Sequence, residues 1–201
     1  VGTHSTGQGH ETSFAQVLAD QLGLPIENIS LRYGDTAFVT AGGGTHSDRS
    51  MRLAGTLIVE AAAEIVERGR SIAARRLEVA SADLAFENGD YRVVGTDRRI
   101  SLLAVARIAE YDMREVLAAV RDFTGRMPAY PGGSAVCELE VDPETAAVEI
   151  TRYTTVDDVG QPINPLILDG QTHGGIVQGI GQALHEGMIF EQATAQVLSG
   201  S

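Results

Sequence analysis

The sequence predicts an α+β fold in which long helices pack on mixed or antiparallel sheets, with βαβ-like local units. Three observations carry this prediction. Residues 13–22 and 50–68 place apolar side chains at helical spacing. Asn88-Gly89 separates two short apolar runs, and this dipeptide favours the type I′ turn of a β-hairpin. Residues 134–141 and 147–156 alternate apolar and polar side chains on either side of a turn, which predicts a second hairpin.

The first helix follows a glycine-rich elbow, Gly7-Gln8-Gly9-His10-Glu11-Thr12, and is ended by Gly23 and Pro25. The first N–H groups of a helix have no internal acceptor and carry the positive end of its dipole. Glycines before the helix let a phosphate approach the backbone closely. The amide of Gln8 both donates and accepts, which suits the edge of a heterocycle. A plain helix start, with Glu11 in its first turn, is the alternative.

The next two elements are a half-buried strand over residues 29–33 and a glycine loop over residues 40–47. The loop leads into an alanine-rich helix from Ser50, which Ser47 or Asp48 would cap. Gly69 is expected to interrupt this helix before it continues over residues 71–77. A second glycine loop feeding a helix repeats the pattern of the first, although an ordinary loop explains it as well.

The middle of the chain carries the Asn88-Gly89 hairpin and a helix over residues 102–110 with Ser101 as its N-cap. The single cysteine, Cys137, falls on the strand over residues 134–141, where we expect a buried structural thiol.

The last third contains five glycines between Gly170 and Gly181, and we expect a helix that begins at Gly170-Gln171. Glycines destabilise a helix interior, so their number predicts close packing against the helix backbone. Gln171, Gln178 and Gln182 would present amides on one face. Tight helix–sheet packing would explain the glycines but not the glutamines.

Composition excludes several classes of function. The chain has 201 residues and a formal net charge of −12, which argues against nucleic acid as a partner. All 15 basic residues are arginine, so lysine-based chemistry is absent. One cysteine allows neither an internal disulfide nor a cysteine metal cage, and the five histidines are too scattered to predict bound zinc. No apolar run is long enough to span a membrane. Both ends look cut, so we expect a piece of a longer polypeptide.

Several motifs together resemble the molybdopterin-binding large subunit of the xanthine dehydrogenase, aldehyde oxidase and carbon monoxide dehydrogenase group. They cover nearly the whole chain in order: Gly7-Gln8-Gly9-His10-Glu11-Thr12, Gly34-Asp35-Thr36, residues 42–50, Asp157-Asp158-Val159-Gly160 with Asn164-Pro165, Gly170-Gln171-Thr172-His173-Gly174-Gly175, and Gln178-Gly179-Ile180-Gly181. The resemblance implies a fold of the molybdenum-cofactor-binding-domain type over residues 1–201, with possible subdomains over 1–125 and 126–201.

The resemblance also implies cofactor contacts. The segment around Gln8 and Gly9 would hold the pterin or the phosphates of molybdopterin cytosine dinucleotide, and Gln171 would hydrogen-bond the pterin. The full set of cofactor-binding residues that it implies is Gly7, Gln8, Gly9, His10, Ser47, Arg49, Ser50, Gln171 and Gln178. Backbone N–H groups would then bind phosphates in an acidic protein.

Two departures from the family pattern bear on function. Asp48 stands where the family usually has a small residue, and its carboxylate would repel a phosphate unless it points away or pairs with Arg49. The family's catalytic glutamate lies in a Gly-Glu segment, and this chain has none. We therefore assign no catalytic residue and expect this chain alone to be inactive.

The whole enzyme, by resemblance, is a cytoplasmic oxidoreductase that oxidises an aldehyde or an aromatic N-heterocycle with water as the oxygen source. Its partners would be the rest of the molybdenum subunit, iron–sulfur clusters and FAD on other subunits or domains, and a small-molecule substrate. Self-association of the chain is expected where apolar surface is exposed. The alternatives are a non-catalytic binding or assembly module and an α+β domain whose glycines serve packing only.

Overall fold

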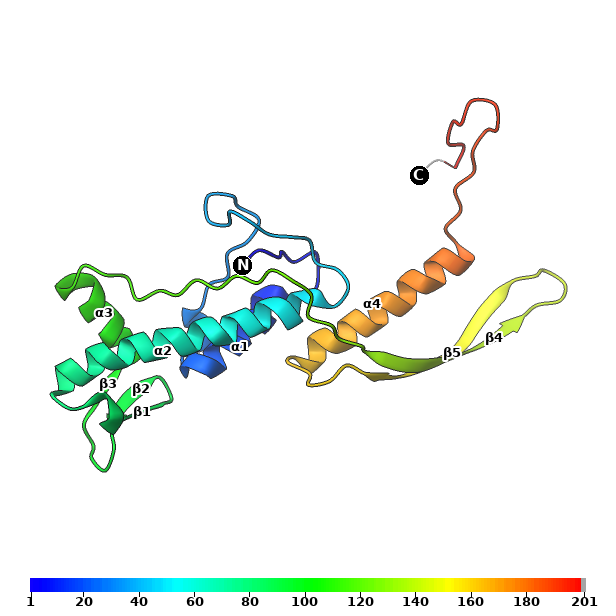
Figure 1. The fold of residues 1–201 in the computed structure, drawn as a ribbon. Helices are drawn as coiled ribbons and strands as arrows, with labels where there is room; N and C mark the ends of the chain where they lie inside the picture. Colours follow the sequence, from blue (N-terminus) through cyan, green and yellow to red (C-terminus); the bar gives the residue numbers. More distant parts are fainter. Residues whose placement is uncertain (200–201) are drawn as a thin grey trace. The chain divides into compact units, whose positions relative to one another are not determined.

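The computed structural model describes residues 1–199, which form two units, residues 1–163 and the part from Asn164 onward (Figure 1). The first unit contains α1 (His10–Leu22), the 3-10 turn η1 (Ile26–Asn28), the π-helical turn η2 (Met51–Gly55), α2 (Thr56–Leu77), the 3-10 turn η3 (Ser81–Asp83), β1 (Leu84–Glu87), β2 (Asp90–Val93), β3 (Arg99–Ser101), α3 (Leu102–Asp112), β4 (Gly132–Val141) and β5 (Val148–Asp158). The second contains α4 (Pro165–Leu184). This composition confirms the predicted α+β class. The predicted subdomains, 1–125 and 126–201, stay a prediction.

The core of the first unit lies where α2 and α3 pack against the sheet β1-β2-β3. Tyr91 from β2 and Val105 from α3 are fully buried there, beside small residues of α2. The sheet lies at the C-terminal end of α2, and α1 packs along the other end of the same helix (Figure 1). Residues 113–131 run back along α2, where the Arg68 guanidinium donates to the carbonyl of Ala118.

Gly69 does not interrupt α2, contrary to the prediction. The helix is continuous from Thr56 to Leu77, and a Cβ on Gly69 would overlap the Tyr91 hydroxyl. That hydroxyl donates to the carbonyl of Val66 at 2.8 Å. Position 69 therefore favours glycine because an aromatic ring packs against the helix backbone there, and not because the helix ends there.

The first hairpin confirms the prediction from Asn88-Gly89. Both turn residues have positive φ, 50° and 80°, as a type I′ turn requires. All strand pairs of the described residues are antiparallel, in the orders β1-β2-β3 and β4-β5. Ser101 caps α3 as predicted, and its hydroxyl accepts from the N–H of Ala104 at 3.2 Å.

The predicted strand over residues 29–33 does not form. The segment alternates between half-buried and exposed side chains, but no neighbouring strand pairs with it in the described residues. A single hydrogen bond reaches its backbone from the chain start: the N-terminal ammonium of Val1 donates to the carbonyl of Arg32 at 2.8 Å. A strand requires a partner for its backbone groups, and the described residues supply none here. The described residues around α1 therefore form no βαβ-like unit.

The hairpin β4–β5 confirms the second predicted hairpin, but its side chains are exposed almost throughout. Cys137, which we expected to be buried, is exposed because no layer of the first unit packs on this hairpin.

In the second unit, α4 begins at Pro165 and not at Gly170 as predicted. The side chain of Asn164 caps it by accepting from the N–H of Ile167 at 3.1 Å, and Pro165 occupies the first turn, where its missing N–H does no harm. Gly170, Gly174, Gly175 and Gly179 have open space where a Cβ would stand, so the described residues do not supply the expected close packing. No helix among residues 1–199 is long and apolar enough to cross a membrane.

Candidate functional site

The elbow before α1 has open space at Gly7 and leads into a helix whose first residue, His10, is buried. Gly9 precedes the helix in the left-handed region, at φ 67°, and its carbonyl accepts from the N–H groups of Thr12 and Ser13 at 3.1 and 3.0 Å. No helix carbonyl accepts from the N–H groups ahead of Thr12. The Glu11 N–H donates to the carboxylate of its own side chain, which lowers the pKa of Glu11. Gly7 has φ 112° and open space beside it. This geometry leaves the backbone accessible to an anionic ligand.

The Gln8 amide is fixed by its neighbour Thr6. Its Oε1 accepts from the backbone N–H of Thr6 at 2.6 Å, and its Nε2 donates to the Thr6 hydroxyl at 3.0 Å. One N–H of the amide stays available for a ligand. The side chain is thus held in one orientation before any ligand binds.

His10 is a buried polar residue in the first turn of α1. Its ring stacks on Phe14 with centroids 4.8 Å apart, and its Nδ1 is buried without a hydrogen-bond partner among the described residues. Desolvation lowers the pKa of His10 below its ordinary value of 6.5, with Glu11 opposing and His4 reinforcing the shift. The imidazole is therefore neutral at pH 7, and its Nδ1 can take part in one further hydrogen bond.

Glu11, beside His10, is held by Tyr33, whose hydroxyl donates to its carboxylate. This hydrogen bond lowers the pKa of Glu11 and raises the pKa of Tyr33. His4 stacks on the Tyr33 ring with centroids 6.3 Å apart. These contacts tie the opening of the chain to the segment after η1.

The loop before η2 carries the second group of predicted residues. Ser47 and Asp48 both have positive φ, and the helix that follows has no side-chain cap. The prediction that Ser47 or Asp48 caps this helix is therefore wrong. The Ser47 hydroxyl lies 3.0 Å from Nδ1 of His46 instead. Arg49 turns back, and its Nε donates to the carbonyl of Gly44 at 2.8 Å. No ion pair joins Asp48 to Arg49 in the described residues.

The two glycine-rich loops, which we call the first loop (residues 2–9) and the second loop (residues 41–50), are clasped together. The N–H of Gly43 donates to the carbonyl of Gly2 at 2.8 Å, and a Cβ on Gly42 would overlap the Gly2 backbone. The Thr3 hydroxyl lies 2.7 Å from both the Thr45 and the Ser50 hydroxyls. Residues 2–4 of the first loop are thus joined to Gly43, Thr45 and Ser50 of the second.

Sequence reasoning missed Thr3, Thr45 and Arg52. The signal for the two threonines was present, because Gly-Thr-His-Ser occurs at residues 2–5 and again at residues 44–47. Arg52 lies in the π-helical turn, and its Nε is buried without a partner among the described residues. Nothing in the sequence marks that turn.

The two buried orphan atoms have equivalent places. His10 Nδ1 and Arg52 Nε are the buried side-chain nitrogen or oxygen atoms without a partner in the described part of the chain. Each lies at the start of a helix that follows a glycine loop. Buried polar groups are nearly always hydrogen-bonded, so these two atoms require partners that the described residues do not supply, and a bound ligand is one such partner.

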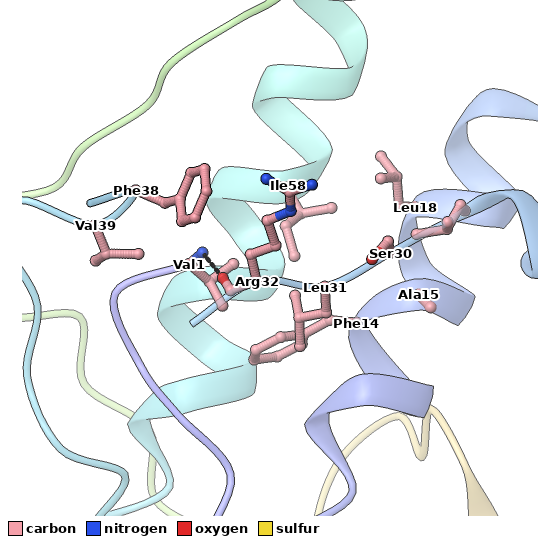
Figure 2. Close-up of a pocket in the computed structure, with 11 residues that line it drawn as sticks. Val1, Phe14, Ala15, Leu18, Ser30, Leu31, Arg32, Phe38, Val39 and Ile58 are labelled. Atoms are coloured by element: carbon pink, nitrogen blue, oxygen red, sulfur yellow. Dashed lines mark hydrogen bonds between the residues drawn. The ribbon is translucent and has the colours of Figure 1, made fainter. Parts of the chain in front are cut away.

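An open pocket of about 360 Å³, lined mostly by apolar residues, lies between α1 and α2 (Figure 2). Phe14, Ala15 and Leu18 of α1 face Ile58 of α2 across it, and residues 29–32 pass along it. The Arg32 guanidinium covers the Phe38 ring, 4.6 Å from its centroid. None of the predicted cofactor residues lines this pocket, so it is separate from the clasped loops.

Gln171 and Gln178 belong to the second unit, where both are exposed on α4. They are seven residues apart, which places them on one face two turns from each other. Residues 1–199 hold no group of three or more His, Cys, Asp or Glu side chains arranged to bind a metal ion.

Comparison with known proteins places this chain in a family. A family model described as the molybdopterin cofactor-binding domain matches residues 1–201. The carbon monoxide dehydrogenase large chain of Hydrogenophaga pseudoflava is 36% identical over 196 residues, which are 95% of this chain and 24% of that protein. The 6-hydroxypseudooxynicotine dehydrogenase complex subunit gamma of Paenarthrobacter nicotinovorans is 39% identical over 198 residues, 96% of this chain and 25% of that protein.

A solved structure gives the same result. The crystal structure of Cu,Mo-CO dehydrogenase in its carbon monoxide reduced state matches with a TM-score of 0.86 and 33% identity, over 98% of this chain and 25% of that one. The chain thus spans about a quarter of the length of these relatives. The resemblance drawn from the sequence is confirmed: the chain belongs to the molybdopterin cofactor-binding domain family, as part of a large subunit of the molybdenum hydroxylase group.

Proposed function

We propose that this chain forms part of the cradle for molybdopterin in its cytosine dinucleotide form. The observation that carries the proposal is the pair of clasped glycine loops with one orphan buried atom at the start of each following helix. An anionic, heterocyclic ligand has the acceptors and donors that these groups lack.

The residues present fit such a ligand. The first-turn N–H groups of α1 and the open space at Gly7 would receive a phosphate, and Arg52 Nε would donate to an anionic oxygen. The free N–H of Gln8 and Nδ1 of His10 would meet the polar edge of a heterocycle. Gly9, Ser47 and Arg49 would line the same ligand, and Ser50 would support it. Gln171 and Gln178 would add amides from α4.

The complete enzyme, on this proposal, oxidises an aldehyde or an aromatic N-heterocycle, with water as the oxygen source. The molybdenum cofactor supplies the two-electron redox chemistry, and the residues of this chain bind and orient it. No catalytic residue is assigned here. The acid–base group, the iron–sulfur clusters and FAD belong to the rest of the large subunit or to partner subunits, and the assembly is cytoplasmic.

The test is cofactor retention by a variant of the complete large subunit. Gln8→Leu removes the amide and should lower the bound molybdenum and the nucleotide released on denaturation, while the circular dichroism spectrum stays unchanged. Gln21→Leu, at an exposed position near the end of α1, is the matched control. Full cofactor content in Gln8→Leu would contradict the proposed contact, and release of a nucleotide other than cytosine would contradict the cytosine form.

A second candidate function is a non-catalytic binding or assembly module. The exposed apolar face of the hairpin β4–β5 favours it, because such a face fits a protein partner. Natively purified protein without molybdenum would support this alternative, and a full complement of molybdenum would exclude it.

A further inference from the structure

Three hydroxyls join the first and second loops in one connected group. Thr3 and Ser50 are buried, at 9% and 7% exposure, and Thr45 is half-buried. Four contacts link the group: Thr45 Oγ1 to the carbonyl of His4 at 2.6 Å, Thr3 Oγ1 to Thr45 Oγ1 at 2.7 Å, Thr3 Oγ1 to Ser50 Oγ at 2.7 Å, and Ser50 Oγ to Thr45 Oγ1 at 3.1 Å.

Proton counting fixes the direction of these bonds. A carbonyl accepts only, so the one proton of Thr45 is donated to His4. Thr45 must then accept from Thr3, which uses the one proton of Thr3. Thr3 must in turn accept from Ser50, whose proton is shared more weakly with Thr45 at 3.1 Å. The order is therefore Ser50 to Thr3 to Thr45 to the carbonyl of His4.

We propose that this group, the hydroxyl clasp (Ser50, Thr3, Thr45 and the His4 carbonyl), couples the two loops, and that Thr3 is the positioning residue through which one loop orders the other. Thr3 lies on the first loop, and both of its hydroxyl partners lie on the second. The proposal rests on the proposed function, because the ordered loops are the ones assigned to the cofactor.

The direction of the bonds decides what Ser50 does. Its proton points to Thr3 and Thr45, so it has none to donate to a phosphate while the clasp is intact. Ser50 therefore supports the second loop, while Ser47 and Arg49 are left to meet the ligand. Connected hydroxyls polarise one another, so removal of the middle member should weaken the whole group.

Among residues 1–199, the other hydrogen bond between the two loops is the backbone bond from Gly43 to Gly2. That bond lies near the beginning of both loops, so without the hydroxyl clasp residues 45–50 keep contacts within the second loop but none of these hydrogen bonds to the first. Loss of the hydroxyl clasp should therefore free the end of the second loop, about 40 residues away from Thr3 in sequence, and leave α1 and α2 in place.

The experiment compares Thr3→Val, Thr3→Ser and the control Thr36→Val, an exposed threonine outside both loops, in the complete large subunit. Valine keeps the shape of threonine and removes the hydroxyl, whereas serine keeps the hydroxyl. In cofactor-free protein, Thr3→Val should accelerate amide hydrogen exchange in residues 45–50 by about threefold to tenfold. Thr3→Ser and Thr36→Val should exchange like the natural protein. Equal exchange in all four proteins would overturn the proposal.

The second measurement is bound molybdenum and released nucleotide. Thr3→Val should lose cofactor while the midpoint of thermal unfolding of the cofactor-free protein falls only slightly, and Thr3→Ser should restore cofactor binding. Faster exchange with full cofactor content would overturn the positioning role. If Thr3→Val does not fold, Ser50→Ala, which removes only the first donor, should give a smaller acceleration in the same residues, and no acceleration would overturn the clasp. Loss of cofactor in Thr3→Val but not in Gln8→Leu would support the clasp and contradict the Gln8 contact.

Discussion

His10 shows how burial of a single residue makes stability depend on pH. Its pKa in the folded protein lies below the ordinary value of 6.5, mainly because burial removes water from the ring. In the unfolded chain the imidazole takes up its proton near pH 6.5, whereas the folded protein takes it up only at lower pH. The unfolded state therefore binds more protons in this window, and the free energy of unfolding falls as the pH drops from about 6.5 to the lowered pKa.

His10→Phe should remove this part of the pH dependence. Phenylalanine keeps a ring against Phe14, which now stacks on His10 at 4.8 Å, and it has no proton to take up. We expect the free energy of unfolding of the variant to change less than that of the natural chain below pH 6.5. Urea unfolding at a series of pH values measures this. Parallel pH profiles for the two proteins would show that His10 is not the group responsible.

Gly69 in α2 is the clearest prediction at the scale of an element. Alanine in a helix interior is normally about 1 kcal/mol more stable than glycine. At Gly69, however, the new Cβ would overlap the hydroxyl of Tyr91, whose pKa burial raises to about 12. Because overpacking costs about 1–3 kcal/mol, we expect Gly69→Ala to destabilise the chain in urea unfolding.

Two comparisons isolate the cause of that loss. Tyr91→Phe removes the oxygen that the Cβ meets, so the double variant Gly69→Ala/Tyr91→Phe should lose less stability than the sum of the single changes. Gly175→Ala in α4, with open space at the Cβ position, should not destabilise its helix. A stabilised Gly69→Ala protein would show that Tyr91 moves aside at little cost.

The contact between the end of α1 and the first hairpin gives another prediction. Gly23 and Gly34 have similar φ values, 60° and 71°, so alanine at either position costs about 1–2 kcal/mol in backbone strain. A Cβ on Gly23 would also overlap the backbone of Asn88 and Gly89, whereas Gly34 has open space. Gly23→Ala should therefore lower the free energy of unfolding clearly more than Gly34→Ala. Equal losses in the pair would mean that strain alone is at work and that the close approach carries no cost.

Local signals predicted the elements whose cause is local. Asn and Gly readily adopt the positive φ that the turn at Asn88-Gly89 needs, and the Ser101 side chain itself accepts the hydrogen bond that caps α3. The strand prediction for residues 29–33 was wrong because a strand depends on a partner strand, which local alternation of side chains cannot reveal. The prediction that Gly69 interrupts the helix was wrong because the ring that requires a glycine there belongs to Tyr91, 22 residues later in the sequence. The start of α4 was predicted at Gly170, where the glycines begin, although Asn164 and Pro165 form a typical N-cap and first helical position six and five residues earlier.

For the candidate site too, the local features were predictable from the sequence and the tertiary contacts were not. Both glycine loops were predicted, and the structure joins them in the first unit. The contacts that join them are tertiary: Thr3 and Thr45 meet across 42 positions, and only their repeated tetrapeptide hinted at the pairing. The orphan state of Arg52 Nε follows from packing around a π-helical turn, which no pattern in the sequence marks.

The hairpin β4–β5 gives the prediction for the chain as a whole. Cross-strand pairs place Cys137 with Tyr153, Leu139 with Ile150 and Val141 with Val148, so these residues form one apolar face, and most of it is exposed. A two-stranded hairpin has little stability of its own. We expect the isolated chain to cover this face by self-association, since each large side chain gains about 1.5–3 kcal/mol when fully buried. In the longer relatives, this chain spans only about a quarter of the length, which leaves much other polypeptide to cover such a face.

Sedimentation velocity over a range of concentrations tests this, with Leu139→Ser on the apolar face and Val136→Ser on the opposite face as its matched control. Leu139→Ser should shift the chain toward monomer, and Val136→Ser should not. The net charge of −12 opposes association, and salt screens that repulsion beyond about 8–10 Å. Added salt should therefore strengthen the association of the natural chain. Weaker association in salt would indicate that ion pairs hold the copies together, and equal behaviour of the two variants would exclude the apolar face as the contact.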